Sequence, residues 1–155
     1  MVDVACGRGR HTLAGARDGL PIHGIDRNRA WLAQLRDEAR AAGLHVGTAC
    51  VDLEAGHPLP LRDASCGALL VFRYLHRPLA PDLERVLRPG GILLYETFTI
   101  HQRKLGYGPS RDAFLLSPGE LPALFPGLHV EDSWEGLSEA PRPAWVARLM
   151  ARRLA

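Results

Sequence analysis

The sequence opens with Met1-Val-Asp-Val-Ala-Cys-Gly-Arg-Gly-Arg10, and this stretch decides the fold that the rest of the chain follows. Val2 to Ala5 predicts a short buried strand, Cys6 to Gly9 predicts a tight turn, and a helix is expected to begin at Arg10. Glycines in such a turn let the backbone approach a ligand, and the helix N-terminus presents free N–H groups. This order is typical of a nucleotide-like binding site, although a glycine turn by itself also occurs for steric reasons.

Two later segments end a short apolar run with an acid. His23-Gly-Ile-Asp26 predicts a second strand, and a carboxylate at its tip can accept both ribose hydroxyls of an adenosine. A structural alternative is that Asp26 or the nearby Asn28 caps the next helix. Cys50-Val-Asp52-Leu predicts the end of a third strand. A fourth landmark, Leu87-Arg-Pro-Gly-Gly-Ile-Leu-Leu-Tyr-Glu96, predicts a helix end, a turn and a strongly apolar strand.

In their order and approximate spacing, these four segments resemble the class I S-adenosylmethionine-dependent methyltransferases, and the resemblance covers nearly the whole chain. Phe72-Arg-Tyr-Leu-His-Arg-Pro-Leu79 and Tyr95-Glu-Thr-Phe-Thr99 look most similar to a bacterial small-molecule branch that includes tellurite-resistance-type methyltransferases. The resemblance implies an enzyme that transfers a methyl group from S-adenosylmethionine to a small-molecule acceptor by in-line displacement.

Alternating strands and helices predict one α/β domain over 1–155, a Rossmann-like, doubly wound and mostly parallel sheet. The resemblance adds a C-terminal antiparallel hairpin, which gives seven strands. We expect strands over 2–5, 23–26, 44–51, 67–72, 92–99, 129–135 and 144–153, and helices over 10–18, 28–42, from near Pro78 to Leu87, and 121–125. Ser117 and Glu120 predict a capping box for the last helix.

The family has helices upstream of its first strand that cover the cofactor. Here the first strand begins at Val2, so we expect these N-terminal cover helices to be absent. The segment from His101 to Pro118 is predicted to be an irregular loop over the carboxyl edge of the sheet. It carries aromatic and basic residues, and we expect it to act as a lid, alone or with a second subunit of a homodimer.

The resemblance also implies which residues contact the cofactor. It places the ribose at Asp26, the adenine at Asp52 with Leu53 beside it, and the methionine amino end near Asp3. Ala5 departs from the family, which has glycine there, and its methyl group narrows the space. Asp3 has the alternative of a buried acid satisfied by backbone donors. The full set is Asp3, Ala5, Cys6, Gly7, Gly9, Asp26, Arg27, Asp52, Leu53 and Phe72.

The candidate catalytic residues follow the fourth strand and are Arg73, Tyr74 and His76. Arg73 would hold an anion, and His76 would accept a proton from the nucleophile. The alternative is that His76 only forms the turn into Pro78. Glu96 and the segment Arg103 to Arg111 are further candidates for acceptor binding. The absence of an Asn/Asp-Pro-Pro-aromatic motif after Phe72 argues against methylation of a base amine.

Composition excludes several function classes. A formal net charge of +2 gives no basis for nucleic-acid or membrane binding. The three cysteines lack metal-ligand spacing, which predicts no metal site and a reduced, cytoplasmic chain. We see no signal peptide and no apolar stretch long enough to span a bilayer.

Two other functions remain open from the sequence. A nicotinamide-dependent oxidoreductase requires G-x-G-x-x-G, and the third glycine position here is Thr12. A cofactor-binding or inactive regulatory module with the same fold is the second alternative. Measured affinity for each cofactor would separate these possibilities.

Overall fold

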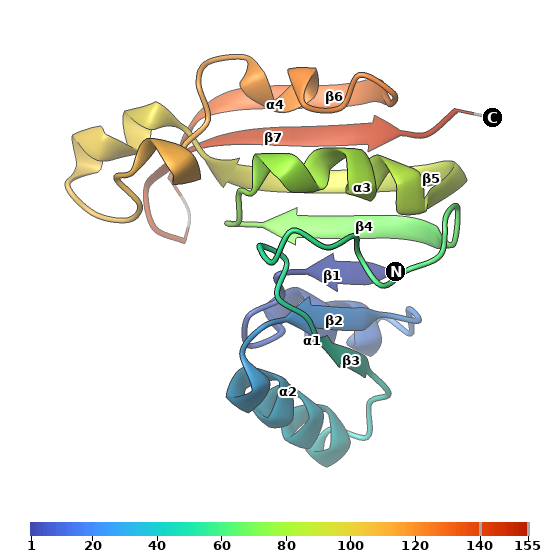
Figure 1. Cartoon of the computed structure of the whole chain (residues 1–155). Helices are drawn as coiled ribbons and strands as arrows, with labels where there is room; N and C mark the ends of the chain where they lie inside the picture. The colour runs from blue at the N-terminus through green and yellow to red at the C-terminus, as the bar shows by residue number, and fades with distance from the viewer. Residues whose placement is uncertain (140, 155) are drawn as a thin grey trace.

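The protein is described here by a computed structural model, which covers residues 1–139 and 141–154. Within these residues, seven strands form one sheet in the order β3-β2-β1-β4-β5-β7-β6 (Figure 1). All neighbouring strands are parallel except β7, which is antiparallel to β5 and β6. The predicted doubly wound sheet with its antiparallel hairpin is therefore confirmed. The strands are β1 (Val2–Val4), β2 (His23–Asp26), β3 (Gly47–Cys50), β4 (Cys66–Phe72), β5 (Leu87–Phe98), β6 (His129–Ser138) and β7 (Ala144–Arg152).

Helices cover both faces of the sheet. On one face, α1 (Arg10–Arg17) and α2 (Arg29–Ala41) share a small apolar cluster that contains Leu13, Leu32 and Leu35. On the other face, α3 (Ala80–Val86) and α4 (Glu120–Ala123) join the main core. Figure 1 shows α3 in front of the sheet and α1 behind it. Among the described residues, no helix combines the length and apolar character needed to cross a membrane.

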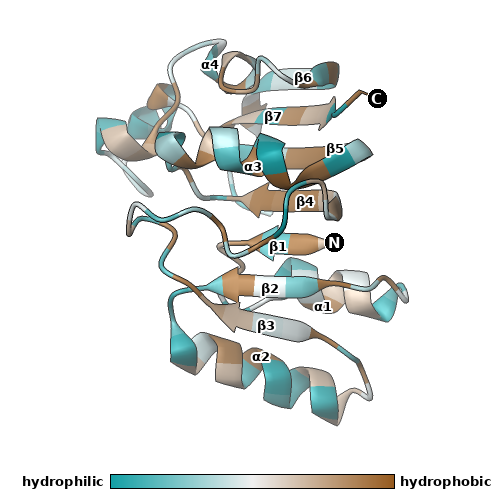
Figure 2. Cartoon of the chain, turned by 45° about the vertical axis from the view of Figure 1, so that its right-hand side comes forward, coloured by the Kyte–Doolittle hydropathy of each residue, from teal (hydrophilic) through white to brown (hydrophobic). Residues whose placement is uncertain are grey.

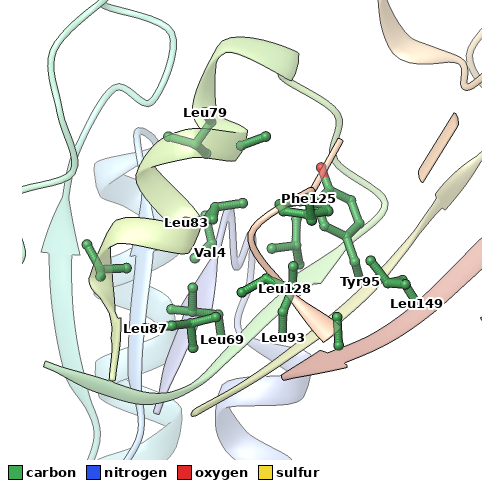
Figure 3. Packing of buried hydrophobic residues seen from close by; sticks show 14 of the residues in the cluster. Val4, Leu69, Leu79, Leu83, Leu87, Leu93, Tyr95, Phe125, Leu128 and Leu149 are labelled. Carbon is green, nitrogen blue, oxygen red and sulfur yellow. The ribbon is translucent and has the colours of Figure 1, made fainter. Parts of the chain in front are cut away.

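The main core lies between α3 and the central strands. Figure 3 shows Leu69 and Leu93 packed beside Leu83, and these three side chains are at most 1% exposed. Alternate residues of a strand point to the same face, which brings Val4 into this layer as well. Figure 2 shows β4 as almost continuously hydrophobic, whereas α2 alternates along its length. The contrast arises because β4 is a central parallel strand that is buried on both faces, whereas α2 packs against the sheet on one face and meets solvent on the other.

Several predicted boundaries are wrong: the strand predicted over 129–135 continues to Ser138, and three others differ for a clear local reason. Ala5 lies outside β1, because its φ of 55° turns the chain out of the strand. The strand predicted over 44–51 forms only at Gly47–Cys50, since the N–H of Leu44 still bonds Ala39 at the end of α2. Leu87 does not end α3 but begins β5, and the Pro-Gly-Gly residues that follow it form an irregularity inside that strand.

The segment predicted to be an irregular loop, His101 to Pro118, contains two short 3-10 helices, at Ile100–Leu105 and Asp112–Phe114. The following helix α4 begins after Gly119 and not after Ser117, and it ends at Ala123. Half of the predicted capping box is present, because the N–H of Ser117 donates to the Glu120 carboxylate at 2.7 Å. The segment lies beside the carboxyl ends of the parallel strands (Figure 1).

Candidate functional site

The site forms where the chain changes direction in the sheet. β1 pairs with β2 on one side and with β4 on the other. The loop after β1 leads to α1 on one face of the sheet, and the loop after β4 leads to α3 on the opposite face, so a crevice opens between the two loops. Ligands of open α/β sheets bind at the carboxyl ends of strands at such a switch point. The residues that follow the parallel strands therefore form the candidate site.

The glycine turn after β1 is held by hydrogen bonds to β2. The N–H of Gly7 donates to Oδ2 of Asp26 at 2.8 Å, and the N–H of Cys6 donates to the carbonyl of Ile25 at 2.9 Å. Gly9 is the N-cap residue that precedes α1, and its φ is 80°. A Cβ at Gly9 would lie 2.4 Å from a methyl carbon of Leu35, so the turn needs glycine here for packing.

A cavity of about 380 Å³ opens over the turn and the ends of β2 and β3. It brings together six of the ten predicted cofactor residues and two of the three candidate catalytic residues. These are Ala5, Gly7, Asp26, Arg27, Asp52 and Leu53, with Arg73 and Tyr74.

The two acids of this cavity have different environments. Asp26 is 8% exposed, and its second oxygen accepts the N–H of Asn28 at 2.8 Å. Both Asp26 oxygens thus have a backbone donor and a further lone pair for a ligand. Asp52 is exposed, and from the described part of the chain its carboxylate accepts a single, local hydrogen bond, from the N–H of Glu54 at 3.0 Å. Asn28 is the residue that caps α2, by accepting the N–H of Trp31, so Asp26 does not serve as that cap.

Three of the predicted cofactor residues do not line the cavity: Asp3 lies beneath the turn, and Cys6 and Gly9 belong to the turn itself. Asp3 is 2% exposed and accepts both the N–H and the hydroxyl of Thr12. Burial raises the pKa of Asp3 to about 6, although the Thr12 donors oppose the shift. Burial likewise raises the pKa of Cys6 to about 12, with the negative charge of Asp3 adding to the effect. Cys6 and Gly9 therefore support the shape of the turn.

Phe72 and His76 lie elsewhere. The Phe72 ring stands 4.1 Å from the ring of His11, measured between centroids, and lines a second cavity of about 510 Å³. His76 precedes the 3-10 helix Arg77–Leu79 and lines a separate hollow with His57 and Pro58. The structure therefore does not bring His76 together with Arg73 and Tyr74.

Arg73 and Phe98 line both cavities. Arg73 has a φ of 59°, its guanidinium lies 4.6 Å from the centre of the Phe98 ring, and it pairs with Glu96 at 3.1 Å. Among the described residues, its Nη1 is buried without a hydrogen-bond partner. Strained backbone and an unsatisfied donor are features of functional sites.

Tyr74, which follows β4, lines the first cavity. Burial, together with the nearby carboxylates of Glu54 and Asp52, raises the pKa of the Tyr74 hydroxyl. The phenol therefore stays protonated at neutral pH, and among the described residues its buried oxygen has no hydrogen-bond partner. Its backbone carbonyl accepts the Tyr95 hydroxyl at 3.0 Å, which ties the end of β4 to the core.

Several lining residues were missed by the sequence interpretation. Trp31 lies on α2, is 39% exposed and lines the first cavity. Thr97 and Phe98 stand at the end of β5, where the same strand-end rule would have found them. His11 lines the second cavity from α1, and no sequence signal marks it, because only the fold brings α1 beside Phe72.

Comparisons with known proteins agree with this geometry. A family model described as a methyltransferase domain matches residues 1–91. A search of curated protein sequences gave no match. A SAM-dependent methyltransferase from Methanosarcina mazei has a similar structure, with a TM-score of 0.81 and 18% identity over 99% of this chain and 91% of that chain.

Two further solved structures are similar. TehB from Haemophilus influenzae has a TM-score of 0.77 and 18% identity over 98% of this chain and 57% of its own. The [4+2]-cyclase SpnF has a TM-score of 0.79 and 22% identity over 99% of this chain and 74% of its own. At these identities the likeness concerns the fold. The predicted assignment to the tellurite-resistance branch stays a prediction.

Proposed function

The chain belongs to the methyltransferase-domain family, and from this premise we propose that it transfers the methyl group of S-adenosylmethionine to a small-molecule acceptor. The observation that carries the proposal is the shared wall of the two cavities, formed by Arg73 and Phe98. A cofactor in the first cavity and an acceptor in the second would meet at this wall. We assign each other residue to the cofactor or to the acceptor according to the cavity that it lines.

The first cavity suits the cofactor because its polar groups match those of an adenosine. Asp26 has free lone pairs on both oxygens for the ribose hydroxyls, and Asp52 with Leu53 lies beyond it for the adenine. Ala5 and Gly7 expose the backbone of the turn to the same space. Asp3 acts through Thr12, by holding the start of α1 against β1.

S-adenosylmethionine supplies a methyl group on a positively charged sulfur, which leaves as a neutral thioether. The new bond to the acceptor forms as the carbon–sulfur bond breaks, and the electron pair goes to sulfur, so no side chain has to act as an acid. The chain's task is then alignment, which can contribute about 7–11 kcal/mol to lowering a barrier. Arg73 and Phe98 would orient the acceptor because they stand at the junction.

The acceptor's proton needs a base within reach. We assign this role to His11 in preference to His76, because His11 lines the second cavity and His76 does not. Burial, reinforced by the charge of Arg10, lowers the pKa of His11, so its imidazole is neutral at pH 7. In the neutral imidazole Nε2 is the nitrogen that accepts a proton, and here it accepts a hydrogen bond from Nη2 of Arg10 at 3.2 Å, so Arg10 would have to turn away before His11 acts as the base.

Calorimetry tests the proposal directly. We expect S-adenosylhomocysteine to bind the wild-type chain, and a nicotinamide dinucleotide not to bind. Binding of the dinucleotide alone would support an oxidoreductase and overturn the proposal. Binding of S-adenosylhomocysteine, with no methyl transfer to any acceptor in a tritium-methyl screen, would leave the fold as a cofactor-binding or regulatory module.

A further inference from the structure

The second cavity is strongly basic for a chain that is nearly neutral overall. Four arginines line it from four parts of the chain, and among its described lining residues Glu96 is the carboxylate that opposes them. Because His11 is neutral, the lining has an excess of three positive charges. The arginines are Arg10, Arg73, Arg142 and Arg148.

Glu96 is already shared between two of these arginines. Its carboxylate pairs with Arg73 at 3.1 Å and with Arg148 at 2.6 Å. Within the described residues, Arg10 and Arg142 form no ion pair. Arg142 lies over the ring of Tyr107, with 3.6 Å between the guanidinium carbon and the ring centre. Nη2 of Arg10 lies 3.2 Å from Nε2 of His11, a neutral partner. Like charges gathered without a carboxylate to balance them favour an anion in the space between them.

Aromatic rings form much of the rest of the wall. Phe72 stacks with His11, Phe98 lies under Arg73, and Tyr107 lies under Arg142. The Tyr107 hydroxyl donates to the carbonyl of Pro143, which fixes the hairpin loop against this wall. Flat apolar walls with guanidinium groups at their edges suit a flat, apolar ligand that carries a negative charge.

We propose that the second cavity binds an aromatic carboxylic acid as the methyl acceptor, with its carboxylate held by Arg142 and Arg10. Guanidinium groups bind carboxylates by paired hydrogen bonds. The inference rests on the proposed function, because it assumes that the cofactor occupies the first cavity. Arg73, which lines both cavities, would lie beside the reacting end of the acid.

The cofactor itself offers a competing anion, since S-adenosylmethionine ends in a carboxylate. If the arginines hold that group, an aromatic acid and the cofactor would compete for the cavity. If the arginines hold the acceptor, both ligands bind together. The test therefore measures the acid in the presence of saturating S-adenosylhomocysteine.

The probes are 4-hydroxybenzoate and its neutral analogue 4-hydroxybenzamide, titrated by calorimetry into the full chain. We expect the acid to bind about tenfold or more tightly than the amide, since a hydrogen bond between charged groups is lost in the amide. Arg142→Gln should weaken binding of the acid about tenfold and leave binding of the amide unchanged. Arg40→Gln, which removes the same charge from an 80% exposed position on α2, should change neither.

The outcomes separate the two proposals. Equal affinity for acid and amide, no binding of the acid, or competition between the acid and S-adenosylhomocysteine would each overturn the anionic acceptor. Failure of S-adenosylhomocysteine to bind would overturn the proposed function instead. In that case the affinities of the acid and the amide can be compared without S-adenosylhomocysteine, and this comparison still decides whether the cavity selects an anion.

Discussion

Oδ2 of Asp3 accepts two hydrogen bonds from Thr12, one from its hydroxyl at 2.7 Å and one from its backbone N–H at 3.0 Å. This pair joins β1 to the first turn of α1 directly beneath the glycine turn. Both side chains are buried, with exposed fractions of 2% and 0%. The carboxylate therefore fixes the entry of α1 from below, while Asp26 holds Gly7 on the cavity side.

The first prediction concerns the pH dependence of stability. Burial raises the pKa of Asp3 from 3.8 to about 6, so the folded state keeps this proton to a higher pH than the unfolded state does. The resulting stabilisation is complete below about pH 4 and is lost as the pH rises through 6, by about 3 kcal/mol. In Asp3→Asn, an amide oxygen can still accept both Thr12 donors and no charge is buried.

Urea unfolding of wild type and Asp3→Asn at several pH values measures this effect. We expect the free energies of unfolding to be similar near pH 4 and the variant to become relatively more stable toward pH 7. Subtracting the free energy of unfolding of one protein from that of the other cancels the contributions of the titratable groups that both contain. A constant difference across this range would show that Asp3 has an ordinary pKa.

A second prediction concerns Gly9. A Cβ there would lie 2.4 Å from Cδ1 of Leu35, which is fully buried, and the φ of 80° is unfavourable for alanine. We expect Gly9→Ala to destabilise the fold by about 2–5 kcal/mol through combined strain and overpacking. Gly19→Ala is the matched control, because its φ is 75° and no atom lies within 4 Å of the new Cβ. Equal losses of stability in the two variants would exclude the Leu35 contact as a cause.

A third prediction concerns Ala5, which has a φ of 55°. Alanine is strained in this region and glycine is not, so Ala5→Gly should raise the free energy of unfolding by about 1 kcal/mol. The variant also removes a methyl group from the cavity wall. Ala14→Gly, at an exposed position of α1, should do the opposite and lower stability by about 0.5–1 kcal/mol. A loss of stability in both variants would contradict this interpretation of Ala5.

The order of the elements was predictable because each has a strong local signal. The apolar run of β4 and the acid at the end of β2 are examples, and the glycine turn was recognised although it was predicted to begin at Cys6 and begins at Ala5. The boundaries were less predictable where tertiary contacts override local preference. Leu87 has the pattern of a helix end, yet it pairs with Cys66 and begins β5, because the Pro-Gly-Gly segment is accommodated as an irregularity of the strand.

For the site, the ends of the predicted strands indicated correctly where the cavity lies, but they did not indicate which side chains line it. Asp26 and Asp52 follow strands and line the cavity, whereas Asp3 lies one layer below because its side chain points toward α1. His76 seemed suited to proton transfer from its place after β4, but the 3-10 helix that it precedes turns it toward another hollow. His11 and Arg142 are distant in sequence, and only the fold unites them.

A fourth prediction separates the two acids of the first cavity. Asp26→Ala should weaken S-adenosylhomocysteine binding about tenfold or more, since two hydrogen bonds to a charged acceptor are lost. It should also lower stability by about 1–3 kcal/mol or more, because the N–H groups of Gly7 and Asn28 lose their acceptor. Asp52→Ala should weaken binding and leave stability nearly unchanged, because Asp52 makes only a local bond. Unchanged affinity in Asp26→Ala would place the ribose elsewhere.

The last prediction concerns the segment from His101 to Pro118, which the sequence suggests is a lid. In the structure it contacts both cavities, with Pro109 and Phe114 at the first and Tyr107 and Gly108 at the second. Gln102 anchors one end of the segment, because its buried side chain donates to the carbonyl of Tyr107 and accepts the N–H of Trp145. The other end is held by Arg77, which donates to the carbonyl of Leu115.

An anchored segment whose middle is exposed can open between its fixed ends, and ligands in the two cavities would hold it closed. We therefore expect saturating S-adenosylhomocysteine to slow tryptic cleavage after Lys104 and Arg111 severalfold. Cleavage after Arg62, in the exposed loop that follows β3, should proceed at the same rate with and without the ligand. If cleavage after Lys104 and Arg111 is equally fast in both conditions, the segment is a fixed wall of the two cavities and does not close over the cofactor.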